Sequence, residues 1–142
     1  MEFNSQISTS RSQSERLLAL GLNKETADCQ YAALVIDWKG NPIANPKWRF
    51  YNHNKDFIVQ NFEQMECCPA WSLHRLLTLL TYQVIYNNTK YEPVIALDGM
   101  AYQDVCTDDP VVGWSGDLYT DVIDCIKWLI SIEQFNQDYL KV

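Results

Sequence analysis

Hydrophobic residues recur with a helical period in the middle of the chain, which predicts a central helix. This segment, Cys67–Tyr86, contains Pro69, which suits the first turn of a helix because its missing N–H costs nothing there. At about 100° per residue, the far side of the helix carries Arg75, Tyr82 and Tyr86. That side either packs inside the domain or binds a partner, since tyrosine and arginine are enriched at interfaces. The stripe that faces the core consists of Leu73, Leu76, Leu77, Leu80 and Val84.

The N-terminal end predicts a polar tail and then two short helices. Residues 1–13 are serine-rich and lack an apolar period, so we expect a disordered tail there. Ser12 and Glu15 have the spacing of a capping box that starts the first helix, and Gly21 ends it. Asn23 then caps a turn or a brief second helix.

Alternating side chains predict β-strands before the central helix. Residues 31–38 form a β-branched and aromatic run with Trp38 on its apolar face. A turn follows at residues 39–42, and a second strand over residues 47–51 has one aromatic and one partly basic face. Residues 57–62 are expected to form a third strand.

A β-hairpin is predicted after the central helix. Two strands, residues 94–97 and 100–106, flank Asp98 and Gly99. An Asp-Gly pair supplies the positive φ values of a primed two-residue turn. Pro93 suits the beginning or the edge of such a strand.

Together these elements predict one α+β domain. Residues 117–132 add an amphipathic helix that closes it. A chain of 142 residues has the size of one ordinary domain, and its 47% apolar content excludes wholesale disorder. We therefore expect a single α+β domain over residues 14–142, with a short N-terminal helix, antiparallel hairpins, the central helix and the C-terminal helix.

Charge is distributed unevenly along the chain. The formal net charge is −7, yet eight acids and no lysine or arginine lie between Lys90 and Lys127, so the remainder sums to +1. An acidic segment repels phosphate, which argues against nucleic acid as its direct partner. The acids either cap turns and a first helical turn, or form a patch that binds a basic protein. The candidates for such a patch are Asp104, Asp108 and Asp109.

The composition also bears on membrane, export and redox questions. No apolar run approaches the roughly 18–20 residues that cross a bilayer, and the N-terminus lacks the apolar region of a signal peptide. We therefore expect a cytoplasmic protein with no membrane partner. Five cysteines are an odd number in such a chain, so reduced thiols, most of them in the core, are expected in place of a disulfide framework.

Two segments hold candidate nucleophiles. Gly113–Asp117 resembles the serine turn of hydrolases, but the second glycine of that turn is missing, and Ser115 fits better as a cap of the final helix. Cys67 and Cys68 precede the central helix, whose dipole can lower a thiol pKa, and His74 lies about two turns along. These cysteines define an enzyme alternative.

Metal, cofactor and nucleotide sites find no support in the spacing of the residues. The two histidines, His53 and His74, are accompanied by no C-x-x-C or H-E-x-x-H motif. Asp104, Asp108 and Asp109 lack the pattern of a calcium loop with its closing glutamate. The five glycines are scattered and draw no phosphate-cradling loop. We expect no cofactor and no metal.

Three separated words of the chain carry a family resemblance. They are Leu18–Asp28 (LALGLNKETAD), Pro69–Leu80 (PAWSLHRLLTLL) and Asp117–Ile130 (DLYTDVIDCIKWLI). In this order they resemble blocks of an uncharacterised family of small proteins from prophages and integrated mobile elements of gut bacteria. The resemblance of these three segments extends over most of residues 17–132, whereas the long polar N-terminus and the tail after Ile132 differ from the family. The resemblance implies no activity and no functional position.

These observations favour a small cytosolic, non-enzymatic interaction protein of a phage or mobile element. Its expected partner is a basic protein, bound through an acidic and aromatic surface. One alternative is a Cys-dependent enzyme that uses Cys67 or Cys68. Another is a structural or self-assembling phage subunit, and the sequence does not set the oligomeric state. The candidate binding residues are Arg75, Tyr82, Tyr86, Asp104, Asp108 and Asp109.

Overall fold

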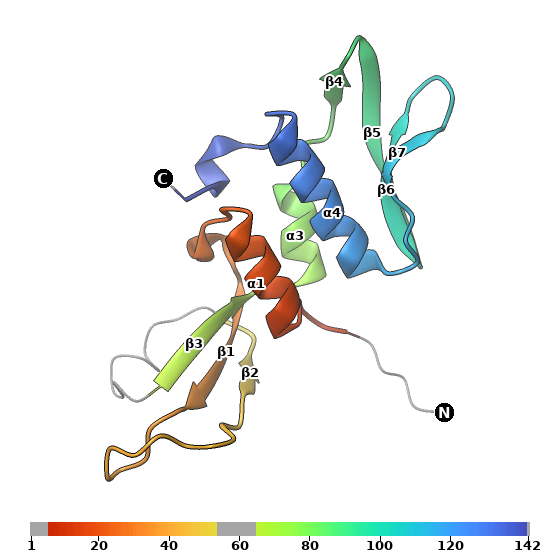
Figure 1. Cartoon of the computed structure of the whole chain (residues 1–142). Helices are drawn as coiled ribbons and strands as arrows, with labels where there is room; N and C mark the ends of the chain where they lie inside the picture. The colour runs from red at the N-terminus through yellow and green to blue at the C-terminus, as the bar shows by residue number, and fades with distance from the viewer. Residues whose placement is uncertain (1–5, 54–64, 142) are drawn as a thin grey trace, which may run out of the picture.

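Helices and strands of the described residues, 6–53 and 65–141, form an α+β fold in this computed structural model (Figure 1). The predicted α+β class is therefore confirmed. The helices are α1 (Arg11–Ala19), α3 (Leu73–Leu79) and α4 (Leu118–Ser131), with two short 3₁₀ helices, η1 (Lys24–Thr26) and η2 (Gln137–Tyr139). The strands are β1 (Cys29–Leu34), β2 (Arg49–Tyr51), β3 (Met65–Ala70), β4 (Val84–Tyr86), β5 (Thr89–Ala96), β6 (Gly99–Asp104) and β7 (Pro110–Gly113).

The strands form two antiparallel sheets at opposite ends of the molecule. The small sheet has the order β2-β1-β3, and the large sheet has the order β4-β5-β6-β7. Helices α1, α3 and α4 lie between the two sheets (Figure 1). The large sheet packs one face on α4, and the small sheet contacts α1 through β3.

Helix α4 forms the centre of the core, as its apolar stripe predicts. The Asp117 carboxylate caps its first turn by accepting a hydrogen bond from the backbone N–H of Thr120. On the sheet side, the Trp128 ring contacts Tyr102 and Tyr91, with centroids 5.4 and 5.5 Å apart. The fully buried apolar residues of the helix are Val122, Ile123, Cys125, Ile126 and Leu129.

The prediction of a long central helix that begins at Pro69 is wrong. Helix α3 has only seven residues and is capped by Ser72, and Pro69 lies in β3, paired with Gln30. Val84 reaches the core from β4 and not from a helix. Two hydrogen bonds of Thr81 explain why the helix ends early. The Thr81 hydroxyl donates to the carbonyl of Gln134, and the Thr81 backbone carbonyl accepts from the Tyr102 hydroxyl. The chain leaves the helix to make these tertiary bonds, while the leucine stripe still packs in or against the core.

The cap of the first helix lies two residues earlier than predicted. The capping box is formed by Ser10 and Gln13, not by Ser12 and Glu15, although both pairs have the same spacing. Ser8 and Thr9 are buried, and the Thr9 N–H donates to the Trp71 carbonyl. Residues 8–13 are therefore part of the packed structure and not of a tail. Gly21 and Asn23 act as predicted, with a φ of +98° after the helix and a cap on η1.

The predicted strands before the central helix are confirmed in part. The first strand runs from Cys29 to Leu34, so it begins and ends earlier than residues 31–38. The Asp37 carboxylate bends the chain there by accepting from the N–H groups of Lys39 and Asn41, which leaves Trp38 86% exposed. The second strand is confirmed as β2, and the expected strand at residues 57–62 lies outside the described residues.

The predicted hairpin is confirmed, but its turn is not of the predicted kind. Ala96 pairs with Gly99, so the turn consists of Leu97 and Asp98, neither of which has a positive φ. A primed turn occurs instead between β4 and β5, where Asn87 and Asn88 have φ values of 51° and 63°. In that two-residue hairpin the backbone N–H of Tyr91 points toward β4. The nitrogen of Pro93, two residues further along β5, points to the same side, beyond the last residue that pairs with β4, which is the edge position predicted for proline.

Trp71 connects three parts of the chain and has no exposed surface. Its indole N–H donates to the Thr26 hydroxyl over 2.9 Å, and its backbone N–H donates to the Thr9 hydroxyl over 3.1 Å. The next residue, Ser72, donates through its backbone N–H and its hydroxyl to the carboxylate of Asp28. Since a buried indole N–H must find an acceptor, this pairing fixes α3 against η1 and the segment before α1.

We predict that Thr26→Val lowers the free energy of unfolding by about 1–3 kcal/mol, because the indole N–H of Trp71 then lies buried without an acceptor. Urea denaturation measures the loss. Thr78→Val is the matched control, since Thr78 is exposed on α3, and its effect stays within about 0.5 kcal/mol. Equal losses in the two variants would contradict the buried pairing.

Candidate functional site

Arg75 does not belong to a binding surface with the two tyrosines. Its guanidinium Nε donates to the carbonyl of Thr26 over 2.7 Å, and the side chain is half-buried between α3 and η1. Tyr82 and Tyr86 lie beyond the end of α3, so the three residues do not share a helix face. The predicted far side of the central helix is therefore wrong, and Arg75 has a structural role.

The two tyrosines flank the edge strand of the large sheet. Tyr86 lies in β4 with its ring edge-on to Trp128 at a centroid distance of 6.3 Å, and about two fifths of it is exposed. Tyr82 lies in the connection from α3 to β4 and is 69% exposed. Between them, Ile85 is 67% exposed. Because Ile85 and Tyr86 are neighbours in β4, their side chains point to opposite faces of the large sheet, so the edge strand presents an aliphatic side chain on one face and an aromatic one on the other.

The predicted acidic residues Asp104, Asp108 and Asp109 lie at the end of β6 and in the β6–β7 loop. Asp104 accepts a hydrogen bond from the N–H of Cys106, and Asp108 has a φ of 61°, which aspartate tolerates better than most residues. None of the three forms an ion pair with a described residue. A backbone bond from Val105 to Lys90 ties the loop to β5, next to the β4–β5 turn.

We call this region the sheet-end surface. It consists of Tyr82, Ile85, Tyr86, Asp104, Val105, Asp108 and Asp109. Five of the six predicted binding residues lie in it, because antiparallel pairing places the β4–β5 turn and the β6–β7 loop at the same end of the large sheet. Its charge is negative and its apolar side chains are exposed. Such a surface suits a partner that carries both positive charge and apolar side chains.

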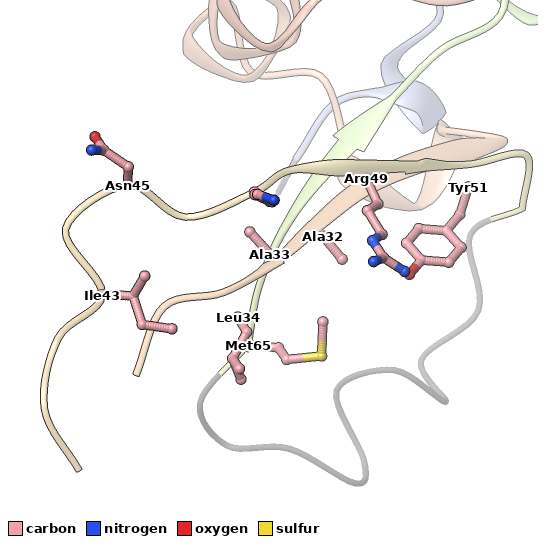
Figure 2. A pocket seen from close by; sticks show the side chains of 9 residues that line it. Ala32, Ala33, Leu34, Ile43, Asn45, Arg49, Tyr51 and Met65 are labelled. Atoms are coloured by element: carbon pink, nitrogen blue, oxygen red, sulfur yellow. The ribbon is translucent and has the colours of Figure 1, made fainter. Parts of the chain in front are cut away.

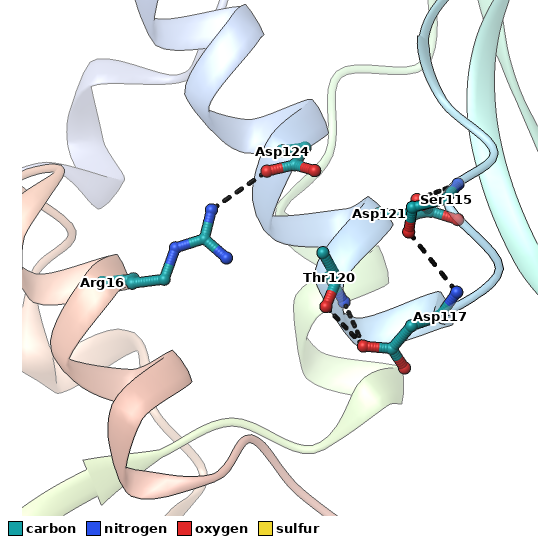
Figure 3. A network of polar contacts seen from close by, with 6 residues as sticks. All are labelled: Arg16, Ser115, Asp117, Thr120, Asp121 and Asp124. Carbon is teal, nitrogen blue, oxygen red and sulfur yellow. Dashed lines mark hydrogen bonds and ion pairs between the residues drawn. The ribbon is translucent and has the colours of Figure 1, made fainter.

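Other acidic residues of the segment between Lys90 and Lys127 have structural roles (Figure 3). Asp117 caps α4, and Asp124 forms an exposed ion pair with Arg16 at 3.0 Å. Asp121 is fully buried, and its two carboxylate oxygens accept from the N–H groups of Met100 and Ser115. The interpretation of the acids as caps is thus confirmed for Asp117 and extends to Asp121.

The segment Gly113–Asp117 is a support for α4. The predicted cap is wrong, because Asp117 and not Ser115 caps the helix, while the Ser115 hydroxyl accepts from the Asp117 N–H. The buried carboxylate of Asp121 also explains Gly99, at which a Cβ would lie 2.5 Å from a carboxylate oxygen of Asp121. Gly99 therefore serves close packing against Asp121 and not a turn.

Cys67 and Cys68 lie in β3 and not at a helix N-terminus. Burial is the main cause that raises the pKa of the Cys68 thiol, which lowers its thiolate fraction at neutral pH. Neighbouring side chains of a strand point to opposite faces, so the two thiols do not converge. His74 is exposed on α3. The helix dipole, on which the enzyme alternative depends, does not act on these cysteines.

The remaining cysteines divide between core and surface. Cys29 and Cys125 are buried, and burial raises their pKa values to about 11 and about 12, whereas Cys106 is exposed. All five cysteines lie in the described part of the chain, and none forms a disulfide. Only two of the five are buried in the core, so the expectation that most of them lie there is wrong.

A groove on the small sheet was not predicted as a site (Figure 2). It has a volume of about 420 Å³ and is lined by Ala32, Ala33, Leu34, Ile43, Asn45, Lys47, Arg49, Tyr51 and Met65. The sequence nevertheless predicts one side of this groove, because the alternation of side chains along residues 47–51 places the basic residues on one face of the strand. Trp48 and Phe50 point to the other face, where they contact Arg11 and Tyr31.

Within residues 6–53 and 65–141, no cluster of three or more histidine, cysteine, aspartate or glutamate side chains has an arrangement that could hold a metal ion. No helix in the same residues has the length and apolar character needed to span a bilayer.

Comparisons with known proteins return no match. The chain matches no protein-family model, no curated protein and no solved structure.

Asp121→Asn is predicted to lower the free energy of unfolding by about 2 kcal/mol, because an amide NH₂ replaces an oxygen that accepts a buried N–H. Chemical denaturation measures this. The control Asp124→Asn breaks an exposed ion pair and costs less than about 1 kcal/mol. A loss at Asp121 no larger than the control's would contradict the role of the buried carboxylate.

Cys68 is predicted to react with iodoacetamide more slowly than free cysteine at about pH 7.5, because burial raises its pKa. The rate then increases as the pH is raised, since more thiolate forms. A Cys67→Ser variant isolates the Cys68 signal in mass spectrometry of labelled peptides. Labelling faster than free cysteine would instead support the Cys-dependent enzyme.

Proposed function

We propose that this chain is a small non-enzymatic protein-interaction module that binds a basic protein partner through the sheet-end surface. The observation that carries the proposal is the co-location of exposed apolar side chains with three aspartates that make no ion pair to a described residue. The resemblance of three sequence words to proteins of prophages and mobile elements supports a role in such an element.

The apolar part of the surface supplies affinity in this proposal. Tyr82 and Ile85 are each about two-thirds exposed on an edge of the large sheet. Removal of apolar area from water contributes about 25 cal/mol per Å², so two large side chains are a substantial anchor. Tyrosine is also enriched among the residues that dominate binding energy.

The acidic part supplies orientation and attraction. Asp104 ends β6, and Asp108 and Asp109 lie in the loop that follows, which concentrates negative charge at one end of the sheet. Charge complementarity speeds encounter and excludes partners of like charge, including nucleic acid. The partner proposed is therefore a cationic protein surface with an apolar centre.

The exposed groove on the small sheet favours a second candidate, a self-assembling subunit. Arg49 lies in β2 and Lys47 just before it, in the small sheet region at the opposite end of the molecule from the acidic loop. Opposite charges at opposite ends suit association of copies in a head-to-tail arrangement.

The proposal predicts that capture of a partner from bacterial lysate depends on the sheet-end surface. Asp104→Asn/Asp108→Asn/Asp109→Asn keeps the shape of the loop and removes its charge. Tyr82→Ser removes an exposed aromatic anchor. Each change is expected to reduce capture of the same protein about tenfold or more at low salt, as quantified by mass spectrometry.

Matched controls separate this surface from total charge and total exposure. Glu25→Gln/Glu133→Asn/Asp138→Asn changes the net charge equally at exposed sites elsewhere. Trp38→Ser removes an 86% exposed aromatic ring outside the surface. Capture that survives the sheet-end changes, or falls equally in the controls, would overturn the proposal.

A further inference from the structure

The groove on the small sheet presents a row of hydrogen-bond donors. Lys47, Arg49 and Tyr51 alternate along one extended segment and line the same groove, so successive groups lie about 6.6–6.8 Å apart along the strand. Figure 2 shows Arg49 and Tyr51 on the same side of β2. The donors form one wall, above a floor of apolar side chains.

The charge of this groove is uncompensated within the described residues. Neither Lys47 nor Arg49 forms an ion pair there, and none of the described residues that line the groove carries a carboxylate. A concave site with one sign of charge attracts groups of the opposite sign. Guanidinium and ammonium groups recognise carboxylates, and Arg49 can do so through two parallel hydrogen bonds.

The floor of the groove requires that the occupant also carry apolar side chains. Leu34, Ile43 and Met65 line it, and Leu34 is 42% exposed. A volume of about 420 Å³ accommodates a few residues of a peptide. The matching occupant is an acidic segment with small aliphatic residues beside its carboxylates.

The chain itself contains such a segment. The β6–β7 hairpin carries Asp104 at the end of β6, Asp108 and Asp109 in the loop, and the valines Val105 and Val111, both more than two-fifths exposed. It cannot reach the groove of its own molecule, because the two sheets lie at opposite ends of the structure (Figure 1).

We propose that the groove on the small sheet binds the acidic β6–β7 loop of a second copy of this chain. The inference rests on the proposed function of the sheet-end surface as an acidic docking surface, and it names the cationic partner as this groove. The contact joins two different surfaces, so association is head-to-tail and produces open chains or closed rings.

The contact is expected to be weak and sensitive to salt. A loop in a groove of this size buries less than about 1,200 Å² in total, which is the range of transient complexes. Each copy also carries a net charge of −7, so copies repel one another at very low salt. At about 0.1 M salt the Debye length is about 10 Å, which screens the repulsion of whole molecules more than contacts between paired charges.

Sedimentation velocity at about 0.1 M salt tests the proposal, with protein concentration varied from about 10 μM to about 1 mM. The wild-type mass is expected to rise above 16.5 kDa with concentration and to return to it at about 0.5 M salt. Lys47→Glu/Arg49→Glu is expected to weaken association about tenfold or more.

A charge exchange gives the sharper result. The groove variant Lys47→Glu/Arg49→Glu and a loop variant, Asp104→Asn/Asp108→Asn/Asp109→Lys, each place like charges on both surfaces. Each variant alone is expected to stay monomeric, whereas an equimolar mixture associates again, because each groove then meets a loop of opposite sign.

A control variant, Lys39→Glu/Lys141→Glu, makes the same change of net charge at exposed sites outside the groove, and it is expected to associate like the wild type. A wild-type mass that stays at 16.5 kDa at every concentration would overturn the inference. Equal loss in the groove and control variants, or a monomeric mixture, would also overturn it. These outcomes leave the capture of another basic protein by the sheet-end surface intact, and that capture is measured separately.

Discussion

The hydrogen bond from the buried indole of Trp71 to Thr26 is the interaction on which the arrangement of the chain depends. Trp71 belongs to the junction between β3 and α3, and Thr26 belongs to η1, so the bond joins segments 45 residues apart. Around it, Asp28 accepts from Ser72, and Arg75 donates to the carbonyl of Thr26. An indole without an acceptor at zero exposure would cost more than most single contacts provide. We call these three side-chain contacts, Trp71 to Thr26, Ser72 to Asp28 and Arg75 to Thr26, the Trp71 clamp. The Trp71 clamp holds the small sheet, through β1 and β3, next to the helices.

The sequence predicts elements well where the signal is local. Asn23 caps η1 and Asp117 caps α4, because the side chain of each accepts a hydrogen bond from a backbone N–H two or three residues further along the chain. The amphipathic pattern of α4 is confirmed since one helix face alone meets the core. Predictions fail where tertiary contacts decide: Pro69 suits a helix start as well as a strand, and pairing with Gln30 selects the strand. Gly99 likewise suits a turn, but the buried carboxylate of Asp121 determines its use.

The candidate site follows the same division. Five of the six predicted binding residues lie in the sheet-end surface, but their closeness results from strand pairing and not from the helix face that the sequence predicts. Arg75 is drawn into the clamp by the carbonyl of Thr26, a contact that no spacing rule reveals. The basic face of residues 47–51 is visible in the alternation of side chains, whereas its groove needs β1 and β3 alongside. The fold thus separates an acidic surface from a basic one by placing their sheets on opposite sides of the helices.

The central claim is that the Trp71 clamp holds until the whole chain unfolds. Hydrogen exchange at the indole Nε1–H of Trp71, followed by NMR, tests this claim most directly. The account predicts that this proton exchanges only through global unfolding, with the same free energy as the slowest backbone amides of α4. Exchange at a much lower free energy, while the amides of α4 stay protected, would show that η1 and the small sheet open independently of the core, and it would contradict the account.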